Sequence, residues 1–496
     1  MIKRLIILVL SLAAIVSVSG QQKQVDFEAD SVQMDVRIGK GAYRLKGNVV
    51  FSHEGAQMYC DSAYFYPRTN SLDAFNNIHI NQADSVHLYG DIMYYNGNTR
   101  IAQIKRNVRL EGNNTLLRTS EIDFDLGQNV GYYTQHADIV SGENNMSSRS
   151  GYYYVNDETY FFRDSVIIVN PDYIIYSDTL KYQTSSSVAW FMGPTEIVSD
   201  TGYIYCESGW YNTETNVSML KKNALVRNES QTITADSIYY ERETGYGEAF
   251  SDIQLVDTAQ NVILKGNHAF VNQKEDNALL TDSALFIYIT ENDSIYAHAD
   301  TLRAIKDDNE KRQLYAYYGV KFFKSDLQGK CDSLYYSTAD SIIRLYKEPV
   351  LWSGENQLTA KYIEVRTKNR EVNQLYLDSI AFIINQVDSA RFNQIKGKTM
   401  TGYFRDNDLY QLDVNGNGQT VYYAKDELEY IGVNIAESSD LKIIFNENKV
   451  DEIRFLVKPV AILYPLEMAP EEELVLDDFE WHALQRPMNK YDIFKK

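Results

Sequence analysis

Apolar and polar residues alternate with a period of two along most of the chain, in runs rich in Val, Ile, Tyr and Phe. This alternation is typical of β-strands that bury one face. No apolar stripe with a helical period is evident before the C-terminal tail. The pattern therefore predicts an all-β protein made of short strands.

The strand-like runs belong to an internal repeat. A small polar pair followed by alternating apolar and aromatic residues recurs every 28 to 33 residues, as in Asp61-Ser62-Ala63-Tyr64-Phe65 and Asp236-Ser237-Ile238-Tyr239-Tyr240. Clear copies start at Asp30, Asp61, Gly90, Ser120, Ser150, Asp178, Glu207, Asp236 and Asp332, and weaker ones at Asn267, Asp300 and Ala360. A period held this tightly predicts stacked units, each burying its apolar face against its neighbours.

A second phrase runs in phase with the first. It is a pair rich in Asn, Asp and Gly, followed by a β-prone run, at Gly47-Asn48, Asn76-Asn77, Arg106-Asn107, Asp164-Ser165, Lys222-Asn223 and Ser251-Asp252. These residue types tolerate left-handed or side-chain-closed turns. We therefore expect tight turns here, joining two or three short strands in each unit. Asn415-Gly416-Asn417-Gly418 is expected to form a sharp hairpin.

The N-terminus has the three-part layout of a secretory signal peptide. Lys3 and Arg4 precede an apolar run from Leu5 to Val18, and small residues follow up to Gly20. As a helix this run would cover about 21 Å, short of the roughly 30 Å hydrocarbon core of a membrane. We predict an exported chain, with an uncleaved membrane anchor as the alternative.

The expected organisation is a signal peptide over 1–20 and regular repeats over 21–250. More divergent repeats of the same body follow over 251–395, then a C-terminal β segment over 396–466. An acidic and aromatic tail, 467–496, is expected to contain a short helix and an extended segment. Its aromatic and acidic residues suit either docking of a partner or capping of the last sheet edge.

Charge and cysteine content limit the partners and the kinds of site that the chain is expected to have. Without Lys3 and Arg4 the chain carries 46 Lys and Arg against 68 Asp and Glu, which disfavours nucleic acid as a partner. The three cysteines, Cys60, Cys206 and Cys331, lie several repeats apart, too far for a disulfide in a stack. We expect them to be reduced and buried. Neither histidine nor cysteine spacing indicates a metal site or a cofactor.

The repeated phrases behind a signal peptide resemble the OstA-like (LptA-type) lipopolysaccharide transport proteins. The resemblance is carried by Val25-Asp26-Phe27-Glu28-Ala29-Asp30-Ser31 and by Tyr43-Arg44-Leu45-Lys46-Gly47-Asn48-Val49-Val50-Phe51. It covers residues 25–250 well and 260–465 more loosely. It implies an elongated open β-jellyroll, a stack of antiparallel units of about 30 residues with an apolar interior.

The same resemblance implies a non-enzymatic periplasmic protein that binds the acyl chains of lipid A and helps to carry lipopolysaccharide to the outer membrane. Its partners would be lipopolysaccharide, inner- and outer-membrane transport components, and other copies joined end to end. Inward apolar positions after the second phrase would line the lipid-binding trough: Val49, Phe51, Ile78, Ile80, Val108, Leu110, Val166 and Ile168. The alternative is that these residues close a dry core.

Two other function classes remain open on sequence. One is a structural or adhesive envelope protein, and the other is a polysaccharide-active enzyme on a parallel β-helix. The recurrent carboxylates (Asp30, Asp61, Asp236, Asp300 and Asp332) would suit the enzyme or a calcium stack. They fall where Asp closes a turn, which is the interpretation we prefer. The many tyrosines are expected to form cross-strand ladders, with one ring of each Tyr-Tyr pair facing in and one facing out.

Overall fold

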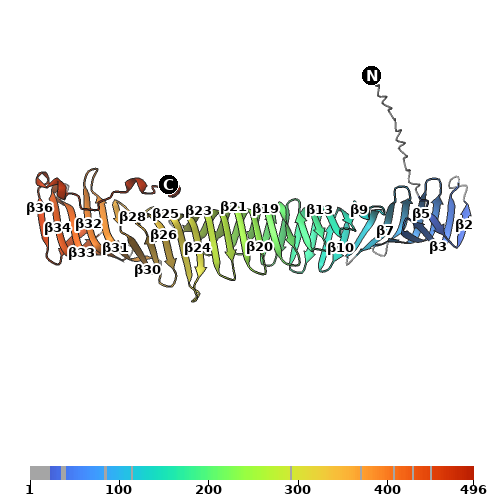
Figure 1. Ribbon diagram of the computed structural model, residues 1–496, viewed down its shortest axis with the longest axis horizontal. Helices are drawn as coiled ribbons and strands as arrows, with labels where there is room; N and C mark the ends of the chain where they lie inside the picture. The colour runs from blue at the N-terminus through green and yellow to red at the C-terminus, as the bar shows by residue number, and fades with distance from the viewer. Residues whose placement is uncertain are drawn as a thin grey trace, which may run out of the picture. The chain divides into compact units, whose positions relative to one another are not determined.

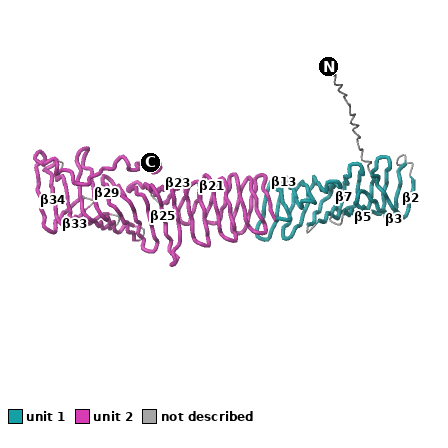
Figure 2. The backbone as a smooth tube through the Cα atoms, viewed as in Figure 1, with its two compact units in different colours: residues 1–186 teal, residues 187–496 magenta. Residues whose placement is uncertain are grey.

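The computed structural model describes residues 23–34, 41–82, 86–112, 115–290, 293–368, 371–405, 408–426, 429–446 and 449–495. The predicted signal peptide, residues 1–20, lies outside the described residues. The chain divides into two compact units, unit 1 (residues 1–186) and unit 2 (residues 187–496), shown in Figure 2. Among the described residues, no helix is long and apolar enough to cross a membrane.

Unit 1 is made of antiparallel β-strands. They are β1 (Asp26–Glu28), β2 (Ser31–Met34), β3 (Tyr43–His53), β4 (Ala56–Tyr66), β5 (Ser71–Gln82), β6 (Val86–Asn96), β7 (Ile101–Gly112), β8 (Thr115–Asp125), β9 (Val130–Tyr133), β10 (Ala137–Ser141), β11 (Asn144–Ser148), β12 (Ser150–Tyr154), β13 (Thr159–Asn170) and β14 (Tyr173–Gln183).

Unit 2 is also made of antiparallel β-strands, and it ends in short 3₁₀ turns (Figure 1). Its first strands are β15 (Val188–Phe191), β16 (Thr195–Ser199), β17 (Gly202–Cys206), β18 (Ser208–Asn212), β19 (Val217–Arg227), β20 (Gln231–Glu241), β21 (Tyr246–Asp257), β22 (Val262–Asn272), β23 (Asn277–Ile289), β24 (Ser294–Lys306), β25 (Arg312–Phe323) and β26 (Gln328–Ser337). The remaining elements are β27 (Ile342–Tyr346), β28 (Val350–Ser353), β29 (Asn356–Thr359), β30 (Tyr362–Lys368), β31 (Glu371–Gln386), β32 (Phe392–Arg405), β33 (Asp408–Asp426), β34 (Glu429–Asn446), β35 (Lys449–Phe455), β36 (Val460–Tyr464), η1 (Leu466–Met468), η2 (Glu471–Glu473), η3 (Ala483–Gln485) and η4 (Asp492–Phe494).

The predicted all-β fold of antiparallel units is confirmed. The strands pair with their neighbours in antiparallel register, as β4 does with β5 and β21 with β22. A parallel β-helix, the scaffold of the rival enzyme hypothesis, is therefore wrong for this chain. In unit 1, the turns at the end of each two-strand repeat finish with a residue in the left-handed conformation: Asn70, Arg100, Asn129 and Glu158.

The second sequence phrase does not form hairpins, and this part of the prediction is wrong. Asn76 and Asn77 both have positive φ (65° and 49°), yet β5 runs through them unbroken. The register with β4 shifts at this point, so the pair is a bulge at which the strand bends. We call such a pair a corner. Asn415-Gly416-Asn417-Gly418 is likewise a corner inside β33, with Gly416 and Asn417 at φ 75° and 53°, and not a hairpin.

The recurrent carboxylates of the first phrase stabilise these corners from the neighbouring strand. The Asn48 side-chain amide donates to Asp30 (2.9 Å), Asn77 to Asp61 (2.9 Å), and Asn107 to Asp91 (2.7 Å). In unit 2 Asn223 donates to Glu207 in the same way (2.8 Å). Asp30 and Asp61 therefore have a structural role, but the predicted one is wrong: each accepts from the side chain of an Asn on the neighbouring strand and does not close a turn through its own backbone.

Candidate functional site

Within each unit, the corners divide the long strands into two half-strands, and the site lies between these halves. We call the half-strands that carry Val49, Ile78 and Val108 arm A, and the half-strands that carry Leu45, Leu72 and Ala102 arm B. The corresponding half-strands of unit 2 keep these names. The space between the arms is the interior. Its mouth lies opposite the corners, between the turns at the free end of arm A (rim A) and those at the free end of arm B (rim B).

In unit 1 the interior is closed. The eight residues predicted to line a trough all point inward, and each is at most 2% exposed: Val49, Phe51, Ile78, Ile80, Val108, Leu110, Val166 and Ile168. Residues of arm B that face them, such as Leu72, Phe124 and Tyr160, are equally buried. The structure thus brings the predicted residues together as the packed core of unit 1, the arrangement expected of the dry-core alternative.

Polar contacts across the mouth hold unit 1 shut. The His53 ring on arm A is bonded through Nδ1 to the Tyr95 hydroxyl on arm B (2.7 Å). Gln82 of rim A donates to the Leu126 carbonyl of rim B (2.8 Å), and the Tyr160 hydroxyl donates to Thr115 (3.1 Å). Further contacts of this kind are Arg100–Glu54 (3.0 Å) and Asn144–Tyr182 (3.3 Å). Sequence patterns did not reveal this row, because its members lie about 30 to 50 residues apart and share no motif.

The interior of unit 2 is different, because its apolar residues near the mouth are only partly buried. On arm A these are Ile204, Val226, Ile233, Leu255, Leu264, Phe286 and Phe322, and on arm B they are Tyr211, Tyr240, Val271, Leu302, Leu314, Tyr336 and Ile343. Residues beside the corners, such as Leu220, Ala284 and Val320, remain buried. The arms of unit 2 therefore meet at the corners and leave apolar surface accessible toward the mouth over residues 204–343.

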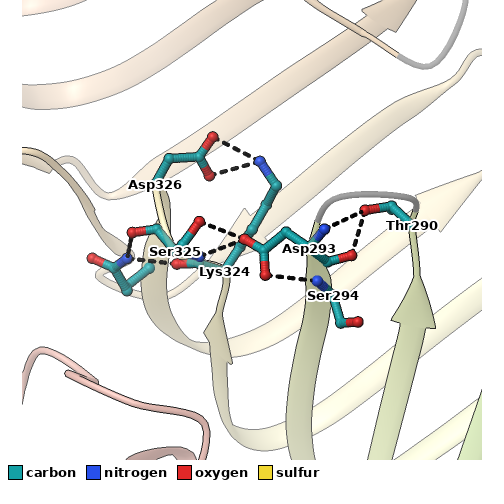
Figure 3. Close-up of polar contacts among 7 residues, drawn as sticks. Thr290, Asp293, Ser294, Lys324, Ser325 and Asp326 are labelled. Carbon is teal, nitrogen blue, oxygen red and sulfur yellow. Dashed lines mark hydrogen bonds and ion pairs between the residues drawn. The ribbon is translucent and has the colours of Figure 1, made fainter.

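Contacts between the turns of unit 2 run along each rim. On rim A, Asp293 accepts the Ser325 backbone N–H (3.0 Å) and the Ser325 hydroxyl, and it also accepts the Ser294 N–H (2.7 Å), as Figure 3 shows. These bonds hold the pKa of Asp293 below its ordinary value. On rim B, Lys306 pairs with Asp276 (3.0 Å). Because these contacts join successive turns of one rim, they stiffen each arm without closing the mouth.

The cysteines lie beside the corners, facing the interior. All three are free and buried, as predicted. Cys60 is opposite Val49 and Cys331 is opposite Val320 in the strand register. Burial raises the pKa of the Cys60 and Cys331 thiols to about 12 and that of Cys206 to about 11. At neutral pH they are uncharged apolar side chains that add to the interior surface.

The surface that this site offers is mainly apolar. Within the described residues, no group of three or more His, Cys, Asp or Glu side chains is placed to hold a metal ion. One ring of each Tyr-Tyr pair was predicted to face out and the other in. This is confirmed at Tyr94-Tyr95, where Tyr94 is exposed and Tyr95 is buried. The partly exposed residues of unit 2 were missed from sequence. Their strands alternate like those of unit 1, and the two units differ in how far the inward residues near the mouth are buried.

Comparisons with known proteins place the chain in a family. The model of the family described as "OstA-like protein" matches residues 22–178 and 179–283, more than half of the chain. No curated protein sequence matches this chain closely enough to count as a relative. Among solved structures, LptH, the LptA-homologous periplasmic component of the lipopolysaccharide transport device of Pseudomonas aeruginosa, is 14% identical. That comparison covers 21% of this chain and 74% of LptH, with a TM-score of 0.19.

A second solved structure is the extracellular domain of the putative one-component system BT4673 from B. thetaiotaomicron. It is 8% identical with a TM-score of 0.09, and the comparison covers 90% of this chain and 97% of that domain. Scores this low carry no argument, so the assignment rests on the family model and on the repeated strand-and-corner units that it spans. On that basis, the chain belongs to the OstA-like protein family.

Proposed function

We propose that the protein binds the acyl chains of lipopolysaccharide in the interior of unit 2 and takes part in carrying lipopolysaccharide across the periplasm to the outer membrane. The observation that carries the proposal is the row of inward apolar side chains, contributed by both arms over residues 204–343, that is only partly buried. An acyl chain lying between the arms would complete this burial. Each methylene removed from water would contribute about 0.8 kcal/mol.

Membership in the OstA-like family supports a role of the lipopolysaccharide-transport type in general. The interior offers apolar contact along its length and polar groups at its rims. That division suits a ligand with apolar chains and a polar head, and it places the head at the mouth. We propose lipopolysaccharide, and transport components of the inner and outer membranes, as the partners.

The eight unit 1 residues predicted from sequence remain part of the proposal. Lipid reaches Val49 or Ile78 only if the arms of unit 1 separate, because both side chains are buried. Separation breaks cross-mouth contacts such as His53–Tyr95. We therefore expect unit 2 to hold lipid in its resting structure and unit 1 to accept it only after opening.

End-to-end association of copies is also a proposal. The last strand, β36, pairs with β34, and its apolar residues are well exposed, with Val460 at 63% and Leu463 at 54%. An exposed apolar edge strand is a template for pairing with another chain. Its partner is another copy or a membrane-embedded transport component.

The test is site-specific photo-crosslinking in cells that make lipopolysaccharide. The probe replaces Leu255 or Phe286, which face the interior, and the matched controls replace Gln254 and Leu285, which face outward on the same strands. Lipopolysaccharide adducts at the inward positions alone support the proposal. A folded, exported protein that gives no adduct at any inward position refutes it and favours a structural or adhesive envelope protein.

A second set of probes at Val49, Ile78 and Val108 tests unit 1. We expect fewer adducts there than at Phe286, because the unit 1 interior is closed in the resting structure. Adducts at these positions should rise in Tyr95→Phe, which removes the hydroxyl that meets His53. Equal labelling of both units in the unmodified chain would contradict the assignment of the resting site to unit 2.

A further inference from the structure

The C-terminal tail does not cap the last sheet edge. After β36 the chain turns back and runs along unit 2 toward β24, as the red ribbon in Figure 1 shows. We call residues 471–495 the strap. It lies on the outer face of arm A, where it covers Trp352, Phe382 and Ile384, side chains that point away from the interior yet are at most 1% exposed. The expected helix is reduced to separate three-residue 3₁₀ turns.

Two buried glutamines hold the strap by its backbone. The Gln394 side-chain amide donates to the Leu474 carbonyl (2.8 Å) and accepts the Leu476 N–H (2.9 Å). Gln357 repeats this pattern six residues further on: it donates to the Glu480 carbonyl (2.7 Å) and accepts the His482 N–H (2.7 Å). Each amide thus pairs with the carbonyl of one residue and the N–H of the residue two positions later.

Aromatic residues lie between the two glutamine contacts. The Phe479 ring packs against Phe392 (centroids 5.4 Å apart) and Phe382 (6.3 Å). The Trp481 ring also packs against Phe392, with the ring centroids 5.2 Å apart. These aromatic contacts add side-chain recognition to the backbone contacts that the two glutamines make.

A third glutamine and an apolar anchor hold the distal end. Arg486 donates through Nε to the Gln328 side-chain carbonyl (2.8 Å) and through Nη1 to the Gly354 carbonyl (2.7 Å). Ile493 is 1% exposed, and the Phe494 ring lies 4.7 Å from the His298 ring. The contacts therefore extend from β32 at one end of the strap to β24 at the other.

The strap depends on these contacts for its shape. Its 3₁₀ turns are too short to persist alone in water. Several of its side chains project into solvent, including Leu484, Met488 and Tyr491. In contrast, Gln357 and Gln394 are at most 2% exposed, and the strap supplies the peptide groups that pair with their side-chain amides.

We propose that this outer face is a peptide-binding track and that the strap is its detachable ligand. The track recognises a segment by two pairs of backbone groups, a carbonyl and an N–H at each glutamine, with a turn and Phe479 between the two pairs. The strap of a second copy presents the same atoms and is the partner in trans. This inference is independent of the proposed lipid site, since it involves the opposite face of arm A.

The experiment uses the full chain with a site-specific protease sequence inserted between Ala469 and Pro470, so that the protein folds with its strap in place. After cleavage, exchange of the strap for a fluorescent synthetic peptide of residues 471–495 is followed by anisotropy. Before cleavage we expect no binding, because a tethered strap competes at an effective concentration near the millimolar range. After cleavage we expect saturable binding that unlabelled peptide reverses.

Variants of both partners test how the peptide is recognised. Gln357→Ala and Gln394→Ala should each weaken binding at least about tenfold, as expected for loss of two buried hydrogen bonds. Gln374→Ala, on arm B of the same unit, is the matched control and should bind normally. In the peptide, N-methylation at Leu476 or His482 and the change Phe479→Ala should weaken binding, whereas Leu484→Ala should not.

Absence of exchange in the cleaved protein would overturn the proposal, because the strap would then be an inseparable part of the fold. Equal effects of Leu484→Ala and Phe479→Ala would also overturn it, since binding would then lack the observed register. Neither result bears on lipid crosslinking at Phe286, so the two proposals fail separately.

Discussion

A matched pair of substitutions tests whether the two interiors differ as the structure indicates. Phe51 in unit 1 is fully buried, and Phe286 in unit 2 is partly exposed at the equivalent inward position after a corner. Phe→Ala at a closed core site costs about 3–5 kcal/mol, through lost burial and the cavity that remains. At Phe286 part of the ring already meets solvent, and an open site leaves no sealed cavity. We expect Phe286→Ala to cost about half as much as Phe51→Ala.

The positions of the tryptophans allow the unfolding of unit 2 to be followed separately from that of unit 1. The four tryptophans, Trp190, Trp210, Trp352 and Trp481, all lie in unit 2, so their fluorescence during urea unfolding reports on that unit. Unit 1 has only tyrosines as large fluorophores and is followed by amide hydrogen exchange in β3 to β5. Separate probes are needed because a chain of two units need not unfold in one step.

The prediction also separates stability from binding. Phe286→Ala should weaken retention of lipopolysaccharide, whereas Phe51→Ala should destabilise unit 1 and leave lipid binding to unit 2 intact. Equal destabilisation by the two changes would refute the reasoning, because the interior of unit 2 would then be closed like that of unit 1.

Further predictions concern the corners, the rims and the thiols. Ile380 is a β-branched residue at φ +55° and is 43% exposed, so Ile380→Asn should raise the free energy of unfolding by about 1 kcal/mol in urea titrations. The pKa of Asp293 is lowered in the folded state, so its contribution is present above about pH 4 and is lost as pH falls through the folded pKa. Thermal melts of Asp293→Asn should accordingly show a smaller loss of stability on acidification than the parent chain. The Cys60 and Cys331 thiols, with pKa raised to about 12, should resist maleimide at pH 8 in the native protein and react fast in urea. Rapid native labelling would contradict their burial.

Much of the fold was predictable because strands and turns carry local signals. The period-two alternation indicated the inward face correctly at Val49, Ile78 and Val108, since side chains on a strand alternate between its two faces. The phrases at Asn76-Asn77 and Gly416-Asn417 correctly marked left-handed backbone. They did not show that the strand continues through the bend, because the same residue types suit a hairpin turn and a bulge.

The candidate site was less accessible to sequence reasoning. Phe51 and Phe286 occupy equivalent positions after a corner and have the same alternating sequence pattern around them. Phe51 is nevertheless buried, whereas Phe286 is partly exposed. The difference depends on contacts between residues distant in the chain, such as His53 with Tyr95 across the mouth of unit 1. The position of the strap depends on Gln357 and Gln394, which look like ordinary surface residues in sequence.

The sequence by itself determined the class of fold, the antiparallel repeat and the family, because these follow from local backbone preferences repeated many times. The tertiary structure alone decided where the arms stay apart and where the tail lies. Both depend on the balance of a few long-range contacts, whose energies of about 1 kcal/mol each leave no periodic trace in the chain.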